Sequence, residues 1–315
     1  MSRILVTGGC GYVGTALVDK LCYLGYKIDI YDNLWFGNPG FDNDLVSVIE
    51  GDLRNIDALN LSDYELIYHL GGIANDPTGD LNPRLTWECN ALATSFLVEK
   101  AVKSGVPRFI FASSGSVYGI QNTSVVDEHC QLIPLTEYNK SKMVTERVLM
   151  SYSEQIAVQI LRPATVSGFS RNFRRDVVVN IFSSDAIESG KITVLGGSQM
   201  RPHIHIDDMV SAYIFMLENP DLLGVFNVGF ENISILDLAN KVADKFGVEI
   251  VIKNSNDPRS YKLNSDKILK AGFRPNFKVV DAIDDIKNAF ESGRLVFTDN
   301  QRRLQWMKEK GFGHE

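Results

Sequence analysis

The stretch Thr7-Gly8-Gly9-Cys10-Gly11-Tyr12-Val13-Gly14 follows a β-rich run at 4–7 and opens a segment with helical spacing at 12–24. Gly8 permits a tight turn directly after a strand, and Gly11 lets a phosphate group approach the backbone. Gly14 lets the helix lie close to the sheet. The N-terminus of that helix presents N–H groups and the positive end of a dipole to an anion. The stretch therefore predicts a strand, a turn and a helix that bind a dinucleotide.

An acidic residue, Asp32, ends the next expected strand at 27–31. A carboxylate at this position bonds both hydroxyls of an adenine ribose and repels a 2′-phosphate, so we expect NAD rather than NADP. A glycine-rich turn without a ligand is the alternative, but the order of strand, loop, helix, strand and acid favours the cofactor. Asp52 and Leu53 are candidates for the adenine contact, and an ordinary strand-end turn is the alternative there.

Short β-rich runs alternate with helical segments through the first half of the chain. This alternation predicts an α/β fold, a Rossmann-type doubly wound parallel sheet with helices on both faces. Further strands are expected at 46–49, 66–69, 108–112 and 158–162, and helices at 83–104 and 137–152.

The rhythm changes after Pro163, which predicts a second, smaller unit. We assign residues 1–168 to an NAD-binding domain and expect 204–230 to rejoin it. Residues 169–203 and 231–315 are assigned to a smaller α/β substrate-binding lobe, with amphipathic helices at 235–246 and 281–291.

Composition excludes several classes of partner. The 315 residues carry a formal net charge of −7, which argues against a nucleic-acid binder, and no apolar run is long enough to span a bilayer. The four cysteines, Cys10, Cys22, Cys89 and Cys130, show no metal-ligand spacing and are expected to be reduced thiols of a cytoplasmic protein.

Two histidines are candidate metal ligands. His203 and His205 alternate on an expected strand and so share one face, but no third ligand falls at a typical spacing. We therefore expect no metal and interpret the pair as strand packing.

A tyrosine and a lysine four residues apart are the candidate catalytic pair. Tyr138 and Lys142 share one face of an expected helix. The phenol, with an ordinary pKa of about 10, becomes a base when a nearby ammonium and the positive nicotinamide ring lower that pKa. Tyr138 would then take a proton from an alcohol while the cofactor takes the hydride. Ser114, at a strand end, would orient the same oxygen. A solvated helix face is the alternative for the pair, and the upstream glycine loop favours catalysis.

These motifs together resemble the extended short-chain dehydrogenase/reductases, in particular the NAD-dependent epimerase/dehydratase family acting on nucleotide sugars. The resemblance covers nearly the whole chain. It rests on the glycine loop, Asp32-Asn33-Leu34, Gly51-Asp52-Leu53, Ser113-Ser-Gly-Ser-Val-Tyr-Gly119, Tyr138-x-x-x-Lys142, Arg201-Pro-His-Ile-His-Ile-Asp-Asp208 and Phe226-Asn-Val-Gly229.

The resemblance implies that Ser114, Tyr138 and Lys142 are catalytic, with Lys142 also bonding the nicotinamide ribose. The residues it places at the cofactor are Gly8, Gly11, Tyr12, Val13, Gly14, Asp32, Asn33, Asp52, Leu53, Leu70, Gly71, Gly72, Asn90, Ser113, Tyr138, Lys142 and Pro163. It also implies a homodimer in which two helices of each chain pair across a two-fold axis.

The implied substrate is a nucleotide-diphosphate sugar, whose phosphates suit arginine forks. Arg201 and Arg259 are the arginines that the family match favours. The cluster Arg171, Arg174 and Arg175 is a further candidate, with a solvated charge run as the alternative. The expected substrate contacts are Asn75, Ser114, Ser116, Thr165, Arg175, Asn180, Arg201 and Arg259.

One departure from the family pattern narrows the activity. The 4,6-dehydratases carry an Asp-Glu pair where this chain has Gly115 and Ser116, which lack a carboxylate for water elimination. The leading hypothesis is a nucleotide-sugar 4-epimerase. The alternatives are a C4 dehydrogenase of surface-polysaccharide biosynthesis that releases a 4-keto product, and a non-catalytic NAD-binding scaffold.

Overall fold

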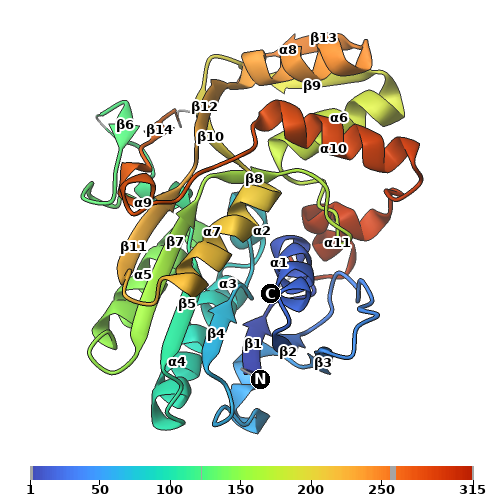
Figure 1. Cartoon of the computed structure of the whole chain (residues 1–315). Coiled ribbons are helices and arrows are strands. Elements are labelled where there is room, and N and C mark those ends of the chain that lie inside the picture. The colour runs from blue at the N-terminus through green and yellow to red at the C-terminus, as the bar shows by residue number, and fades with distance from the viewer. Residues whose placement is uncertain (1–2, 122, 256–259, 314–315) are drawn as a thin grey trace.

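The computed structural model describes residues 3–121, 123–255 and 260–313, and its centre is a seven-stranded parallel sheet (Figure 1). In sheet order the strands are β11 (Gly224–Val228), β7 (Ala157–Pro163), β5 (Arg108–Ala112), β4 (Leu66–His69), β1 (Arg3–Thr7), β2 (Lys27–Asp32) and β3 (Val46–Glu50). All six pairings are parallel. The expected doubly wound α/β fold is confirmed.

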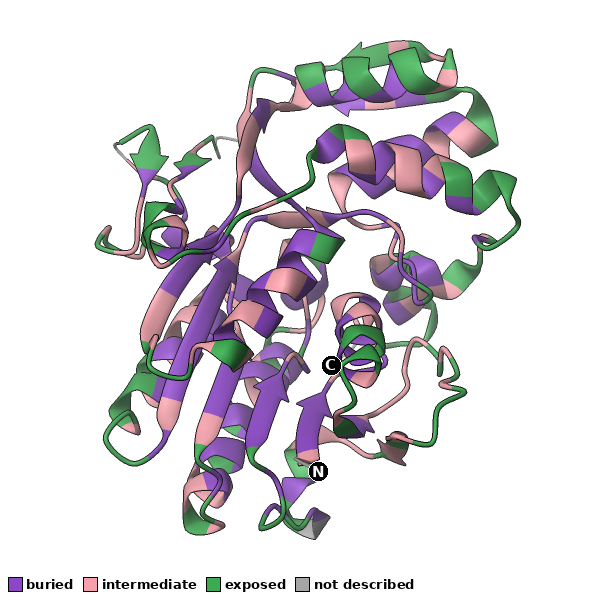
Figure 2. Ribbon diagram, in the orientation of Figure 1, coloured by how far each residue is buried: buried purple, intermediate pink, exposed green. Residues whose placement is uncertain are grey.

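Alternating side chains of the strands pack against two layers of helices. On one face Ile4 and Val6 of β1 join the core formed with α1 (Tyr12–Tyr23) and α7 (Ile206–Glu218). On the other face Leu5 joins the core formed with α4 (Ala93–Lys103) and α5 (Glu137–Ser151). Successive residues of a strand point to opposite faces, which is why so short a strand serves both layers. Figure 2 shows the central strands buried almost throughout.

The long helix expected at 83–104 is present, but a wider turn interrupts it. It consists of α3 (Pro83–Trp87), the π-helical turn η2 (Glu88–Leu92) and α4. Such π turns occur where a helix must present side chains at a special position. A short helix that the sequence did not suggest, α2 (Asp76–Leu81), precedes it and is capped by Asn75.

A smaller lobe lies above the carboxyl ends of the main strands (Figure 1). Its core is formed by α6 (Val178–Ser189), α8 (Ile235–Phe246), α10 (Val279–Glu291) and the paired strands β9 (Lys191–Leu195) and β13 (Glu249–Lys253). A three-stranded sheet of β12 (Glu231–Ser234), β10 (Met200–His205) and β8 (Thr165–Ser167) connects it to the main sheet. The remaining elements are η1 (Leu53–Ala58), η3 (Gly115–Tyr118), β6 (Val125–Val126), β14 (Lys262–Leu263), α9 (Asp266–Lys270), η4 (Asp299–Gln301) and α11 (Arg303–Glu309).

The C-terminal segment does not stay with the smaller lobe, to which the sequence assigned it. Met307 of α11 joins a core cluster with Ile73, Leu85 and Cys89 of the NAD-binding half, and Trp35 and Phe36 pack on that cluster. The chain therefore returns from the upper lobe to the segments that follow the carboxyl ends of β2 and β4.

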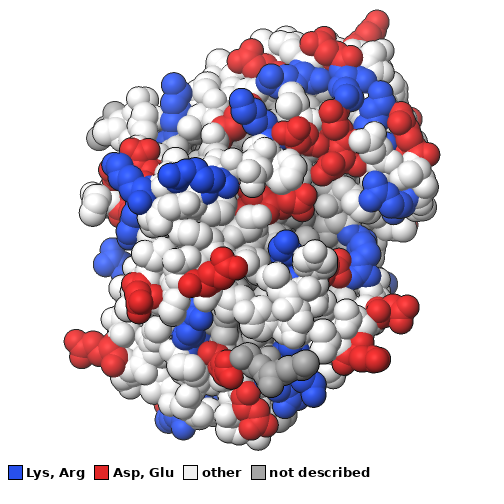
Figure 3. Space-filling view, viewed as in Figure 1, with Lys and Arg blue, Asp and Glu red and all other residues white. Residues whose placement is uncertain are grey.

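Charged side chains of both signs lie at the surface of the protein. On the face shown in Figure 3, acidic and basic side chains are interspersed. Among the described residues, no helix is both long and apolar enough to cross a membrane.

Candidate active site

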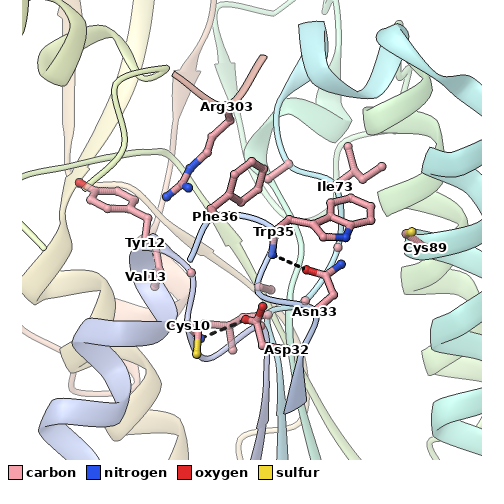
Figure 4. Close-up of a pocket in the computed structure, with 18 of the residues that line it drawn as sticks. Cys10, Tyr12, Val13, Asp32, Asn33, Trp35, Phe36, Ile73, Cys89 and Arg303 are labelled. Atoms are coloured by element: carbon pink, nitrogen blue, oxygen red, sulfur yellow. Dashed lines mark hydrogen bonds between the residues drawn. The ribbon is translucent and has the colours of Figure 1, made fainter. Parts of the chain in front are cut away.

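A cavity of about 250 Å³ lies at the carboxyl ends of the main strands, which is where ligands bind in open parallel sheets. Figure 4 shows it between the glycine loop, the loop after β2 and the C-terminal segment. Its walls include all but one of the expected cofactor residues: Gly8, Gly11, Tyr12, Val13, Gly14, Asp32, Asn33, Asp52, Leu53, Leu70, Gly71, Gly72, Ser113, Tyr138, Lys142 and Pro163.

The glycine loop has the shape that a dinucleotide needs. Gly8 has a φ of +71°, and a Cβ there would lie 2.6 Å from the backbone of Gly71. A Cβ on Gly14 would lie 2.3 Å from the oxygen of Gly8, so only glycine lets α1 approach the loop. A Cβ on Gly11, in contrast, would have only the oxygen of Gly8 nearby, at 3.1 Å. No side chain caps the N-terminus of α1. The first turn of α1 can therefore give its N–H groups to phosphate oxygens.

Asp32 is held in place by backbone donors. Its carboxylate accepts hydrogen bonds from the N–H of Cys10 at 3.1 Å and from the N–H of Leu34 at 2.9 Å. Burial raises the pKa of Asp32, and these two bonds oppose that rise. The carboxylate thus joins the glycine loop to the loop after β2 and faces the cavity, as ribose recognition requires.

Asn90 is the expected cofactor residue that does not line the cavity. It is buried in the π turn, where its Oδ1 accepts from the Ile73 N–H at 2.8 Å. Its Nδ2 donates to the Ile73 carbonyl and to Ser141 Oγ, both at 3.0 Å. These bonds occupy both ends of the amide. Asn90 therefore positions the loop after β4 against α5 from behind the cavity wall.

Tyr138 reaches the cavity from the first turn of α5. Its ring is 9% exposed, and burial raises the pKa of its phenol to about 12. A hydrogen bond with Ser114 and the charge of Arg174 lower this pKa, whereas Asp76 raises it. The expected lowering by Lys142 is absent, and burial outweighs the contributions of Ser114 and Arg174 in the chain alone.

Lys142 lines the cavity one turn after Tyr138. Its Nζ donates to the Ala112 carbonyl at 2.8 Å and lies 4.6 Å from the centre of the Phe111 ring. Burial lowers the pKa of Lys142 to about 8, and the carboxylate of Glu146 opposes that change. The ammonium is therefore close to losing its proton near neutral pH.

The serines after β5 form a chain of hydroxyls beside Tyr138. Ser114 Oγ lies 2.7 Å from Ser116 Oγ, and Ser116 donates to the side chain of Asn139. Neither Ser114 nor Ser116 is among the residues that line the cavity. Ser113 does line it, and its hydroxyl donates to Glu146, which is paired with Arg162.

The arginine cluster before α6 contributes a different arginine from the one expected. Arg175 is buried in an ion pair with Glu188 and lies over the Phe297 ring, away from the cavity. Arg174 lines the cavity instead and donates to the Ala74 carbonyl at 3.1 Å. Arg171 pairs with Asp19 at the surface. Adjacent residues in this extended turn point in different directions, so the cluster could not identify the inward member.

The other expected substrate contacts lie outside the cavity wall. Asn180 is fully buried and bonds the Gly168 N–H, the Tyr12 hydroxyl and the Arg174 carbonyl. Asn75 caps α2 through the Thr78 N–H, with a positive φ of 78°.

Two of the remaining contacts lie on the connecting sheet. Thr165 stands opposite His203 there, and Arg201 is on the adjoining strand β10. Arg259 lies outside the described residues.

Several cavity residues have no motif in the sequence. They come from the loop after β2, from the segment between β8 and α6 and from the chain end: Trp35, Phe36, Asn172, Arg303 and Met307. The aromatic pair directly after the ribose-binding turn was the one available local signal. Arg303 and Met307 had none, because only tertiary folding brings the C-terminus to the glycine loop.

The two histidines of β10 are both buried. His205 stacks on Phe277 at 4.6 Å, and its Nδ1 accepts the Asp207 N–H at 3.1 Å. Its Nε2 lies 3.1 Å from a carboxylate oxygen of Asp285, which the distant helix α10 supplies.

The fold, the glycine loop and the Tyr-Lys pair define an NAD-binding enzyme of the Rossmann type, and the comparisons identify its family. A model of the NAD dependent epimerase/dehydratase family matches residues 4–229. The chain belongs to that family, and NAD is its cofactor.

Relatives in the family carry more than one activity. The chain is 28% identical to a putative UDP-glucose 4-epimerase of Methanocaldococcus jannaschii over 297 residues, covering 90% of this chain and 97% of that protein. It is 28% identical to UDP-glucuronic acid decarboxylase 1 of Danio rerio over 272 residues, 82% of this chain and 65% of that protein. The UDP-glucuronic acid 4-epimerase from Bacillus cereus, solved with UDP-glucuronic acid and NAD, superposes with a TM-score of 0.81 at 26% identity, covering 92% and 99% of the two chains.

Proposed function

We propose that the protein is a nucleotide-sugar 4-epimerase that oxidises and reduces C4 within one cavity. The observation that carries this proposal is the hydrogen bond of Ser114 with Tyr138, whose side chain lines the same cavity as the glycine loop. A phenol in this position, oriented by a hydroxyl, suits proton transfer with a sugar hydroxyl.

The chain's own residues divide the work between them. Asp32 and the first turn of α1 hold the cofactor, which when bound accepts a hydride from C4 and returns it. Tyr138 removes the proton from the C4 hydroxyl and gives it back after the ring has turned. Ser114 holds the same oxygen, and Lys142, one turn along α5, favours the phenolate when it is protonated. Arg174 is the arginine placed to meet a substrate phosphate near the reacting end.

Two features favour epimerisation over its alternatives. Positions 115 and 116, which follow Ser114 after the end of β5, hold glycine and serine. No carboxylate is therefore available there for water elimination. The C-terminal segment adds side chains to the wall of the cofactor cavity, and additional contacts with a bound cofactor suit a reaction that regenerates NAD in place. A C4 dehydrogenase that releases a 4-keto sugar uses the same residues and is the second candidate.

The decisive experiment follows reduced nicotinamide by its near-ultraviolet absorbance. Purified protein is mixed with excess NAD and UDP-, GDP-, CDP- or dTDP-sugars, with UDP-sugars first because the relatives' names contain them. We expect one sugar to be converted to its C4 isomer without accumulation of NADH. Steady accumulation of NADH would establish the dehydrogenase and end the epimerase proposal. Release of carbon dioxide from a UDP-uronic acid would end both.

A further inference from the structure

A buried arginine from the end of the chain faces the cofactor cavity. Arg303, the first residue of α11, is 4% exposed and lines the cavity wall. Its guanidinium donates to the Asn300 carbonyl at 3.0 Å, to the side chain of Asn172 and to the Phe173 carbonyl at 3.5 Å. All three acceptors are neutral.

The charge of this guanidinium has no direct counter-charge. Among the described residues, no carboxylate oxygen lies within 4.0 Å of the Arg303 guanidinium. Burial and, after it, the charge of Arg174 lower the pKa of Arg303 to about 9. Asp176, whose carboxylate accepts from the Arg303 backbone N–H at 2.9 Å, and Asp32 oppose this. A buried cation without a paired anion is costly, so its retention at a cavity wall indicates that an anion completes the site.

The guanidinium lies close to the glycine loop that receives phosphates. Figure 4 shows it between Tyr12 and Phe36, above the glycine loop. Asn172, which accepts from Arg303, donates to the Cys10 carbonyl in the glycine loop at 2.6 Å. On its other side the guanidinium lies 4.1 Å from the centre of the Phe36 ring. Arg303 is therefore next to the glycine loop.

The other arginine of the cavity is directed elsewhere. Arg174 bonds the Ala74 carbonyl and acts electrostatically on Tyr138, which places it toward the reacting end. Arg303 acts electrostatically on Asp32, and Arg174 also acts on Arg303. The two arginines are therefore neighbours in the cavity, with Arg174 toward Tyr138 and Arg303 toward Asp32.

Contacts within the chain hold Arg303 in position before any ligand arrives. Asn300 donates to the Phe36 carbonyl at 2.9 Å, and Asn82 donates to the Phe312 carbonyl at 3.0 Å. Trp35 packs on Phe312 with ring centres 4.6 Å apart. The segment 299–313 is thus fastened at several points to the loop after β2 and to the start of α3. A donor that is already in place costs little entropy when it binds.

We propose that Arg303 binds the diphosphate of the dinucleotide cofactor beside the glycine loop. The α1 N-terminus supplies N–H groups to the phosphates, and the guanidinium adds charged donors. The C-terminal segment is then part of the cofactor site. This inference rests on NAD being the cofactor and does not depend on which reaction the sugar undergoes.

Binding of cofactor fragments tests the inference. Calorimetry would compare NAD, ADP and adenosine on the parent protein, on Arg303→Met and on the control Arg302→Gln. Arg302 is the neighbouring arginine, half exposed and paired with Glu188 and Asp185, so its variant removes one charge from the same segment. We expect Arg303→Met to weaken NAD and ADP by about 10- to 100-fold, as for loss of a charged hydrogen bond, and to leave adenosine unchanged. The control should bind all three as the parent does.

Other outcomes would overturn the inference. Equal weakening of adenosine would mean that Arg303 only shapes the fold, and unchanged NAD binding would mean that it does not touch the cofactor. If Arg303→Met does not fold, Arg303→Lys keeps the charge but lacks the fork. Its NAD and ADP affinities should still fall relative to adenosine, and parent-like affinities would reject the proposal.

Discussion

At Tyr138, burial and hydrogen bonding act on the pKa in opposite directions. Burial holds the pKa at about 12 in the chain alone, so the phenol is protonated at neutral pH. Lys142 has a pKa of about 8, so the pair changes its proton count first at the lysine. The reactive form, phenolate beside ammonium, has the same proton count as phenol beside neutral amine. Its population therefore rises with pH up to about 8 and then levels.

The shared proton of Tyr138 and Lys142 predicts how the rate depends on pH and how a substitution of Tyr138 acts. We expect kcat/KM to rise with pH and to level near pH 8, or lower if the positive cofactor ring depresses both pKa values. Tyr138→Phe should lower kcat by about 10²- to 10⁴-fold, the usual contribution of a general base, with NAD affinity unchanged. Steady-state kinetics from pH 6 to 9 and NAD calorimetry measure both. Turnover of Tyr138→Phe at the parent rate would remove Tyr138 from the mechanism.

At the scale of elements, a buried ion pair joins α5 to β7 behind the catalytic residues. Glu146 and Arg162 are 3% and 5% exposed and share two hydrogen bonds, of 2.9 and 2.6 Å. Glu146 also accepts from Ser113, and Arg162 donates to Tyr118 at 2.8 Å. The helix that carries Tyr138 and Lys142 is therefore tied through this pair to the strand beside the cavity.

Removal of one charge should expose the cost of burying the other. Glu146→Gln is expected to lower the free energy of unfolding by about 3–5 kcal/mol, because Arg162 remains buried without its partner. Denaturant unfolding measures this. Glu99→Gln, which breaks the exposed pair with Lys103 on α4, serves as the control and should change stability little. A loss in Glu146→Gln no larger than in the control would show that the pair does not hold α5 in place.

At the scale of the whole molecule, the helix formed by η2 and α4 exposes large apolar side chains. Leu92 and Phe96, about half exposed and one turn apart, lie beside α5, where Met150 is 38% exposed. These residues are on the two helices that family resemblance predicts to pair across a two-fold axis. We therefore propose a homodimer formed through α4 and α5.

Light scattering tests the dimer. The parent should have twice the mass of one chain, and Phe96→Glu should shift it to the monomer, because a carboxylate would be buried in the interface. Leu195→Glu, at a similarly exposed position on β9 in the smaller lobe, is the matched control and should stay dimeric. A monomeric parent, or a Phe96→Glu variant that remains dimeric, would count against this interface.

Features that depend on neighbouring residues could be predicted from the sequence alone. Glycines at 8, 11 and 14 set a local turn, alternating hydrophobic runs set the parallel sheet, and a four-residue spacing put Tyr138 and Lys142 on one face. Which side chains face the cavity depends instead on packing between segments that are distant in the sequence. Arg174 rather than Arg175 points inward, because that choice depends on packing against Glu188 and Phe297.

Long-range contacts explain the other differences between the residues expected at the cavity and the residues that line it. Asn90 and Asn180 are polar residues near the site, yet buried backbone groups of neighbouring loops use up their hydrogen bonds. Arg303 reaches the glycine loop from the other end of the chain because Met307 buries itself beside Ile73 and carries the segment with it. No local pattern encodes such a contact, since its energy arises only when the distant surfaces meet.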